Sequence, residues 1–176
     1  KYVFDKEPEN KFVGNYENIF VGFSNDAAVR RRAASGGLIT SVACYLLDNN
    51  LVDGVISLAP SKDKPWRFEP YIARNSNDVF RGAQSKYTIS PVNQILSLID
   101  KEPQNSKFAM VGIPCQIHSI RKLQIIKHKA ASQIKLFLGS FCGNIFSFPK
   151  QIIVTIIYFS KFYSVLFWEC ESFFIF

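Results

Sequence analysis

The sequence has few cysteines, and they are too widely spaced to suggest a disulfide framework. Cys44, Cys115, Cys142 and Cys170 lie far apart in a chain of 176 residues, whereas small disulfide-stabilised domains carry dense, regularly spaced sets. No secretory signal opens the chain. We therefore expect a protein of the reducing cytoplasm, whose cysteines are free for other chemistry.

Acidic residues are also in the minority, at 14 against 21 lysines and arginines, which gives a formal charge of +7. A cationic field gathers nucleic acid, an anionic cofactor or an acidic partner equally well. The tightest cluster, Arg30 to Arg32, has no interleaved aromatic residue and no nucleic-acid motif beside it. We therefore expect no nucleic-acid partner and rank the phosphate of a nucleotide cofactor higher.

One long apolar run, residues 151–168, is close to the shortest length that spans a bilayer. Lys161 lies in its middle, and a charge at the centre of a spanning helix costs about 2.5–3.5 kcal/mol. The sequence therefore disfavours a membrane-spanning role.

Hydrophobic periodicity predicts strands that alternate with helices. Strands are expected at residues 19–23, 55–58, 71–73, 108–111 and 134–141. Helices are expected after Ser35–Gly37 as far as Asn49, from a Ser76 cap through Phe80, from a Ser90 cap followed by Pro91, and after Cys115. This alternation is typical of an α/β domain with a mostly parallel or mixed sheet flanked by helices. The apolar C-terminal portion does not fit the pattern, and we expect it to be incomplete or aberrant.

The first segment with chemical potential is Arg31–Gly37, which ends in Ser-Gly-Gly at a helix entrance. Glycines let backbone amides approach an anion, and a helix N-terminus adds partial positive charge. Taken alone, the segment is more simply explained as a tight turn beside solvated arginines.

The second segment is Gly82–Tyr87, in which Ser85, Lys86 and Tyr87 are consecutive. The lysine and the two hydroxyl groups could bind a phosphate, and the aromatic ring could stack on a flavin or a base. Solvated side chains in a surface loop are the simpler alternative.

The third segment is Gly112–His118, with Cys115 at a predicted strand-to-helix turn. A helix start favours the thiolate, which serves as a nucleophile or an iron ligand. Cys142 follows another expected strand and would be a second ligand. His118 could instead act as a base for Cys115, although no orienting Asn or Asp is identifiable, and Cys44 fits a buried, structural cysteine on an apolar helix face.

Taken in order, these segments resemble the coenzyme F420 hydrogenase/dehydrogenase beta-subunit family. The matching pieces are Ser35–Gly37, Leu51–Gly54, Ser85–Tyr87, Gly112–Gln116 and Phe141–Gly143. The ordered set is specific although each piece is not, and it covers residues 21–144. The resemblance implies an N-terminal flavin-oxidoreductase module at residues 17–100, the start of a C-terminal iron–sulfur module at 101–146, and an atypical apolar tail at 147–176.

The resemblance also implies cofactors, partners and residue roles. Family members carry FAD and 4Fe-4S clusters, and they pass electrons between a reduced deazaflavin coenzyme, or ferredoxin in some relatives, and a partner subunit or substrate. The partner would be a hydrogenase, dehydrogenase or reductase subunit, or ferredoxin. By motif match, flavin phosphate would be held by Ser35, Gly36 and Gly37, the flavin would be lined by Ser85, Lys86 and Tyr87, and the cluster thiolates would be Cys115 and Cys142.

The C-terminal end departs from this family. Family members continue with a Cys-x-x-Cys pair that completes the cluster, whereas residues 148–176 hold only Cys170. Because a cluster usually needs four thiolates, the sequence predicts an incomplete cluster and an oxidoreductase inactivated by truncation or a shifted reading frame. A non-catalytic nucleotide- or anion-binding module is the second hypothesis.

Overall fold

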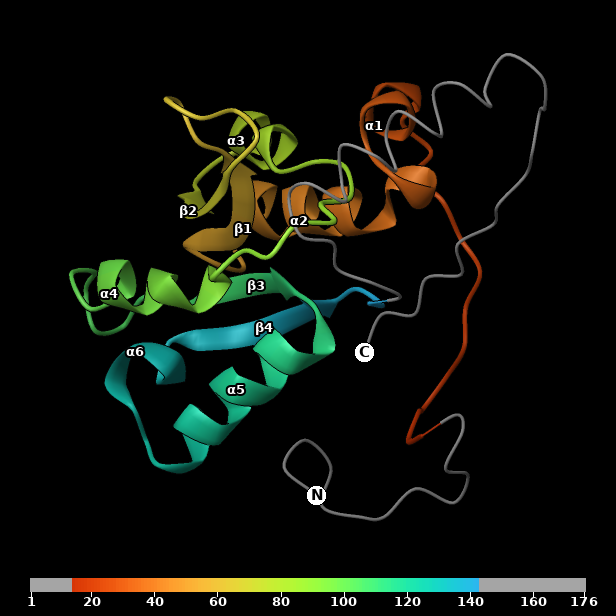
Figure 1. The fold of residues 1–176 in the computed structure, drawn as a ribbon. Helices are drawn as coiled ribbons and strands as arrows, with labels where there is room; N and C mark the ends of the chain where they lie inside the picture. The colour runs from red at the N-terminus through yellow and green to blue at the C-terminus, as the bar shows by residue number, and fades with distance from the viewer. Residues whose placement is uncertain (1–13, 143–176) are drawn as a thin grey trace.

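The computed structural model describes residues 14–142, which form a four-stranded mixed sheet with helices on both faces (Figure 1). In chain order the elements are α1 (Ala27–Arg32), η1 (Ser35–Gly37), α2 (Leu38–Asp48), β1 (Gly54–Pro60), β2 (Phe68–Ala73), α3 (Ser76–Arg81), η2 (Val92–Ile95), α4 (Leu96–Ile99), β3 (Phe108–Gly112), α5 (Pro114–Ile125), α6 (Lys129–Ser132) and β4 (Ile134–Gly139). The predicted α/β class is confirmed.

The strand order is β2-β1-β3-β4, with β2 antiparallel to β1 and the other pairs parallel. Gly112, the last residue of β3, is in register with Gly139, the last residue of β4. The chain segments that leave these two strands therefore start side by side. We call this end of the parallel strands the carboxyl edge.

Alternation along the strands sends side chains into two cores, one on each face of the sheet. On one face, buried residues of α2 and α3 pack against Val55, Ala73, Ala109 and Leu138. On the other face, residues of η2, α4, α5 and α6 cover Ile56, Phe108, Met110 and Phe137. Figure 1 shows β3 and β4 between α2 and α3 toward the top and α5 and α6 toward the bottom.

Helix α2 shows why the predicted helices form where they do. Ala43, Leu46 and Leu47 are buried on one side while Tyr45 is exposed, which is the apolar stripe that helical spacing produces. The predicted stop is also present, because Asn49 is the C-cap and Asn50 takes a left-handed φ of 53°, which asparagine tolerates better than most residues.

Side chains at the opposite end of the sheet join β1 to the segment that precedes β3. The Asp53 carboxylate accepts from the backbone N–H of Lys107 at 2.7 Å. Arg74 donates to the Asp53 carbonyl at 2.8 Å and forms an ion pair with Glu102. Strands from both sides of residue 100 thus belong to one sheet, and a division into modules near that residue stays a prediction.

The predicted strand at residues 19–23 is wrong. These residues pair with no strand of the described sheet, and Ile19, Phe20 and Val21 are exposed at 53%, 79% and 102%. A backbone hydrogen bond joins the end of this segment to the fold, because the Ser24 N–H donates to the Gly36 carbonyl at 2.8 Å. Apolar character alone does not make a strand, because a strand also needs a partner with which its backbone can hydrogen-bond.

Two predicted caps and two strand limits also need correction. Asn75, not Ser76, caps α3 by accepting from the Asp78 N–H at 3.0 Å, and Ser76 instead donates to Asp48 at 2.7 Å. The helix after Ser90 begins as a 3-10 turn at Val92, with Pro91 itself as the cap. Strand β2 begins earlier than predicted, at Phe68, and β4 ends earlier, at Gly139.

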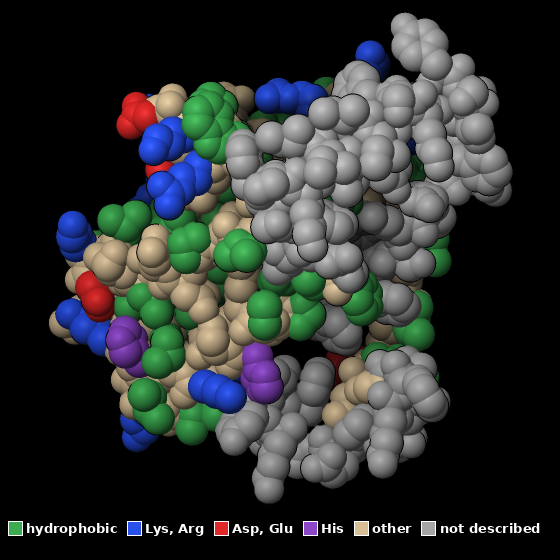
Figure 2. Space-filling model, viewed as in Figure 1, with side chains coloured by type: hydrophobic (Ala, Val, Ile, Leu, Met, Phe, Trp, Pro, Cys, Tyr) green, Lys and Arg blue, Asp and Glu red, His purple; other side chains and the backbone are tan. Residues whose placement is uncertain are grey.

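The surface seen in Figure 2 carries lysine and arginine side chains along its left and upper margins, with hydrophobic side chains between them. Within residues 14–142, no helix combines the length and apolar character that crossing a bilayer requires. The apolar run at 151–168 and Cys170 lie outside the described residues, as do the predictions made for them.

Candidate functional site

Ser35, Gly36 and Gly37 form a left-handed turn directly before α2. Their φ angles are 50°, 72° and 76°, and the turn is closed by the Gly37 N–H donating to the Ala34 carbonyl at 3.0 Å. A Cβ on Gly36 would lie 2.9 Å from the Phe23 Cβ, and one on Gly37 would lie 2.8 Å from the Val29 Cγ1. Both glycines are therefore required by the chain's own packing, whether or not a ligand approaches them.

The turn leaves the N-terminus of α2 as the candidate anion-binding group. The first amides of a helix have no acceptor within it, and the macrodipole places partial positive charge there. Arginines at the end of α1 lie close by in sequence. Arg30 stacks over the Phe23 ring at 5.1 Å and Arg32 over the Phe80 ring at 4.3 Å. This arrangement suits an anionic group such as a phosphate.

The segment Gly82–Tyr87 is a compact loop built around the ammonium group of Lys86. This group donates to the carbonyls of Gly82, Ala83 and Gln84, the last two at 2.9 and 2.8 Å. Burial lowers the pKa of Lys86 from 10.5 to about 8, so at pH 7 it is charged. Ser85 and Tyr87 are exposed on the same loop.

Gln84 brings the first two predicted segments together. Its side-chain amide donates to the Arg32 carbonyl at 3.0 Å, across 52 residues of sequence. Figure 1 shows the yellow-green chain after α3 running toward the orange junction of α1 and α2. The Ser-Gly-Gly turn and the Ser-Lys-Tyr loop are therefore neighbours, although nothing in the sequence marks Gln84 as the link.

The two predicted metal-binding cysteines lie at the carboxyl edge. Cys115 is three residues beyond Gly112, in the first turn of α5, and Cys142 is three residues beyond Gly139. Gly112 and Gly139 are register partners, and the Ser140 N–H donates to the Gly112 carbonyl at 2.9 Å. Both thiols are exposed. Within residues 14–142, no three metal-binding side chains converge into a ready-made site.

Gln116 is a positioning residue that sequence reasoning did not single out. Its Oε1 accepts from the Ile113 N–H at 3.1 Å, and its Nε2 donates to the Ser90 carbonyl at 3.3 Å. The first contact closes the turn that holds Cys115, and the second ties that turn to the chain after the Ser-Lys-Tyr loop. A glutamine at the third position of a helix is a known N-terminal signature, so this signal was available in Gly-Ile-Pro-Cys-Gln.

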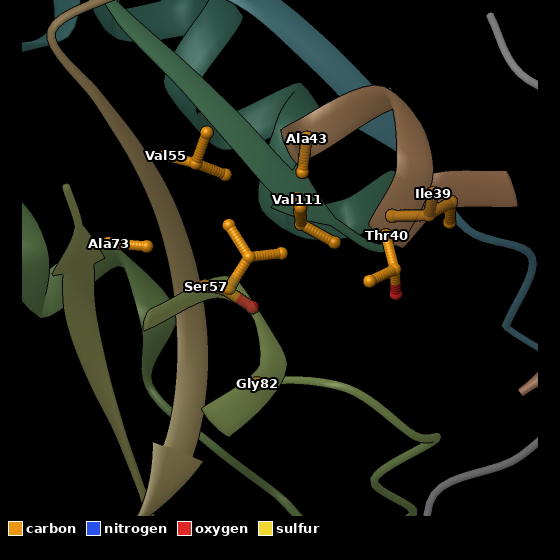
Figure 3. Close-up of a pocket in the computed structure, with 9 residues that line it drawn as sticks. Ile39, Thr40, Ala43, Val55, Ser57, Ala73, Gly82 and Val111 are labelled. Atoms are coloured by element: carbon orange, nitrogen blue, oxygen red, sulfur yellow. The ribbon is translucent and has the colours of Figure 1, made fainter. Parts of the chain in front are cut away.

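A small cavity lies beneath the N-terminal half of α2, as Figure 3 shows. It has a volume of about 30 Å³ and is lined by Ile39, Thr40, Ala43, Val55, Ser57, Ala73, Val79, Gly82 and Val111. This is room for a water molecule and far too little for a flavin ring. A ring would have to lie outside this cavity.

Cys44 contrasts with the other two described cysteines. It is half-buried and packs against the core beneath α2, as the sequence predicts. Burial raises the pKa of its thiol above the usual value, which makes the thiolate less available. Its environment is that of a structural side chain.

Comparison with known protein families gives two consecutive matches. Residues 19–97 match the family described as coenzyme F420 hydrogenase/dehydrogenase, beta subunit N-term, and residues 105–157 match the family that describes the C terminus of the same beta subunit. Together the matched ranges cover most of the chain, including all three segments discussed above.

Individual relatives agree. The coenzyme F420 hydrogenase subunit beta of Methanothermobacter thermautotrophicus is 32% identical over 148 residues, covering 82% of this chain and 52% of the relative. The F420-dependent formate dehydrogenase subunit beta of Methanocaldococcus jannaschii is 32% identical over 124 residues, covering 70% of this chain and 32% of the relative. The coenzyme F420-dependent sulfite reductase of the same organism is 35% identical over 101 residues, covering 57% of this chain and 16% of the relative.

The fold has a counterpart among solved structures. A chain of the xenon-derivatised F420-reducing NiFe hydrogenase complex from Methanosarcina barkeri superposes with a TM-score of 0.68 at 26% identity, covering 76% of this chain and 46% of that one. The chain spans about half the length of the hydrogenase beta subunits that it matches. The sequence matches and the shared fold agree that this chain belongs to the coenzyme F420 hydrogenase/dehydrogenase beta-subunit family.

Proposed function

We propose that this chain is part of a flavin and iron–sulfur oxidoreductase subunit that passes electrons between a reduced deazaflavin coenzyme, or ferredoxin, and a hydrogenase, dehydrogenase or reductase partner. Relatives named as F420-dependent hydrogenase, formate dehydrogenase and sulfite reductase support this class. Because the chain spans about half of such a beta subunit, the activity belongs to a larger whole to which these residues contribute.

The observation that carries the proposal is the position of Cys115 and Cys142. The paired strand ends Gly112 and Gly139 each lead, three residues later, to an exposed cysteine. Two exposed thiols that follow neighbouring strands at one edge suit two corners of an iron–sulfur cluster, since thiolates are the usual ligands. The described residues supply two of the four ligands, so the remaining ones must come from outside residues 14–142.

The phosphate-binding part of a flavin site fits the N-terminus of α2. We assign to Ser35, Gly36 and Gly37 the turn that aims the first amides of α2 at a flavin phosphate, with the arginines at the end of α1 adding positive charge. The loop Ser85, Lys86 and Tyr87 lies beside this turn through the Gln84 contact and would line the flavin. When bound, the flavin would take up a hydride as two electrons and release them singly to a cluster.

A second candidate function is a non-catalytic nucleotide- or anion-binding module. The observation that favours it is the left-handed turn before α2 with arginines nearby, whereas only two cysteines lie at the carboxyl edge among the described residues. In that case the chain would bind FAD or another nucleotide without passing electrons.

The test is an anaerobic titration of FAD into the 176-residue chain, followed by addition of reduced F420. We expect saturable quenching of flavin fluorescence and then bleaching of the flavin absorbance as a hydride reaches the ring. Arg31→Gln should weaken FAD binding, whereas Lys101→Gln, the same charge change at an exposed site away from α2, should not. Absence of FAD binding would overturn the proposal, and bound FAD that stays oxidised would favour the second candidate.

A further inference from the structure

The contacts of Lys86 identify a role for this residue that differs from gripping a ligand. An ammonium group has three donors, and those of Lys86 are directed at three backbone carbonyls of its own loop. Each donor would have to leave a carbonyl before it could reach a phosphate. The side chain is also half-buried.

One of the carbonyls that Lys86 binds, that of Gly82, lies at the end of a helix. Helix α3 ends at Arg81, and Gly82 is its C-cap. The last carbonyls of a helix have no partner within it and carry partial negative charge, which a lysine near the helix end can neutralise. Lys86 therefore caps α3 at Gly82 and also binds the next two carbonyls of the loop, those of Ala83 and Gln84.

Closing the helix in this way requires the chain to turn back sharply. Gln84 adopts a left-handed φ of 77°, a conformation that costs a residue with a Cβ about 1–2 kcal/mol. The surrounding contacts must offset this strain. Lys86 donates a hydrogen bond to the Gln84 carbonyl, and the Gln84 side-chain amide donates one to the Arg32 carbonyl. Hydrogen bonds therefore stabilise both the backbone and the side chain of the strained residue.

The other side of the loop is fixed by close packing. A Cβ on Gly82 would lie 2.7 Å from both the Ser57 Oγ and the Tyr71 hydroxyl oxygen, so the start of the loop lies directly on β1 and β2. The loop is thus held to the sheet at Gly82 and to the end of α1 at Gln84. Ser85 and Tyr87 are exposed on this loop, as is Gln84.

We propose that Lys86 and Gln84 form a clasp that holds the loop Gly82–Tyr87 in one conformation before any ligand binds, and that Lys86 is a positioning residue rather than a phosphate ligand. The clasp fixes where Ser85 and Tyr87 stand relative to the N-terminus of α2. Its effect on FAD rests on the proposed function, whereas its effect on the loop does not.

The test compares backbone amide hydrogen exchange in Lys86→Met, which keeps the apolar stem, with Lys101→Met as the matched control. In the absence of FAD, we expect Lys86→Met to speed exchange at Gly82–Tyr87 by about tenfold, the change expected from losing one or two hydrogen bonds of ordinary net strength. Exchange in β3 should be unchanged, and Lys101→Met should match the wild type throughout. Normal β3 protection also establishes that the variant folds.

A second variant and a second condition complete the test. Gln84→Asn keeps a side-chain amide, and asparagine tolerates the left-handed conformation. Its side chain is one methylene shorter and should not reach the Arg32 carbonyl, so this variant should also speed exchange in the loop. If Lys86 is a ligand instead, Lys86→Met will leave exchange of the ligand-free loop unchanged and will remove only the protection added by FAD. That result overturns the proposal. If the wild type binds no FAD, the proposed function fails, while the ligand-free exchange still decides the role of Lys86.

Discussion

Substituting Gly37 by alanine should destabilise the chain strongly, because two costs coincide at this position. Its φ of 76° lies where a Cβ costs about 1–2 kcal/mol. The new Cβ would also lie 2.8 Å from the Cγ1 of Val29, which is buried in α1 at 6% exposure, and such overpacking typically costs about 1–3 kcal/mol. Alanine also reduces the conformational entropy of the unfolded chain, which offsets these costs by about 0.4–1 kcal/mol. We therefore expect the free energy of unfolding to fall by about 2–4 kcal/mol.

Two other glycines give a graded control for this prediction. Gly36→Ala has a similar φ of 72°, and its Cβ would lie 2.9 Å from the Cβ of Phe23 and 3.3 Å from its Cα, so the backbone would have to move, but in an irregular segment where Phe23 is 60% exposed rather than in the core. We expect it to lose about 1–2 kcal/mol. Gly22→Ala meets nothing within 4 Å and has no left-handed φ, so it should stay within about 0.5 kcal/mol of the wild type.

The assay is urea unfolding followed by far-ultraviolet circular dichroism, with the three variants measured side by side. If Gly37→Ala proves as stable as Gly22→Ala, the left-handed turn before α2 is not as described.

The predicted losses of stability also affect how cofactor-binding experiments are designed. Loss of FAD binding in a Gly36 or Gly37 variant would report damaged folding as well as a lost phosphate contact, so variants of the exposed Arg31 are the cleaner probes of the anion site.

Three further predictions concern other parts of the fold. Phe108→Ala, at a site with 0% exposure in the core, should lower the free energy of unfolding by about 3–5 kcal/mol in urea titrations, whereas Phe20→Ala, at 79% exposure, should change it by less than about 0.5 kcal/mol. Burial raises the pKa of Tyr71 from 10.0 to about 12, so between these pH values the native state keeps a proton that the unfolded chain releases. The free energy of unfolding should therefore fall as pH rises across that window. Tyr71→Phe should flatten this fall, and an unchanged slope would contradict the assignment. Cys44, half-buried and with a raised thiol pKa, should react with a maleimide more slowly than the exposed Cys115, as measured by peptide mass spectrometry, and equal rates would place Cys44 at the surface.

The elements that the sequence predicts well are those whose signals are local. Helix α2 carries its apolar stripe and its asparagine stop within one stretch, and β3 is a short apolar run that ends in glycine. The segment at residues 19–23 has the same apolar character as a strand, yet no strand of the described sheet pairs with it. Local composition cannot show whether a partner strand is available.

The candidate site likewise contains features that the sequence predicts and features that it does not. Cys115 and Cys142 could be placed after strands from the sequence, and their common edge follows from the parallel pairing of β3 and β4. Lys86 could be identified as a residue of interest, but the direction of its ammonium group, back onto its own loop, depends on the left-handed turn at Gln84. No sequence rule predicts a glutamine there, because the residue is held by contacts with distant parts of the chain.

The most direct test of the proposed iron–sulfur site is the contribution of each cysteine to iron binding. Iron and sulfide would be reconstituted anaerobically into the wild-type chain joined to the remainder of a beta subunit, and into the same protein carrying Cys115→Ala, Cys142→Ala or Cys44→Ala. Bound iron and the electron paramagnetic resonance signal of the reduced cluster would then be measured per chain. We expect loss of the signal in Cys115→Ala and Cys142→Ala, with wild-type values in Cys44→Ala. Equal loss in all three variants, or full retention in Cys115→Ala and Cys142→Ala, would contradict the assignment of the carboxyl edge as the iron–sulfur site.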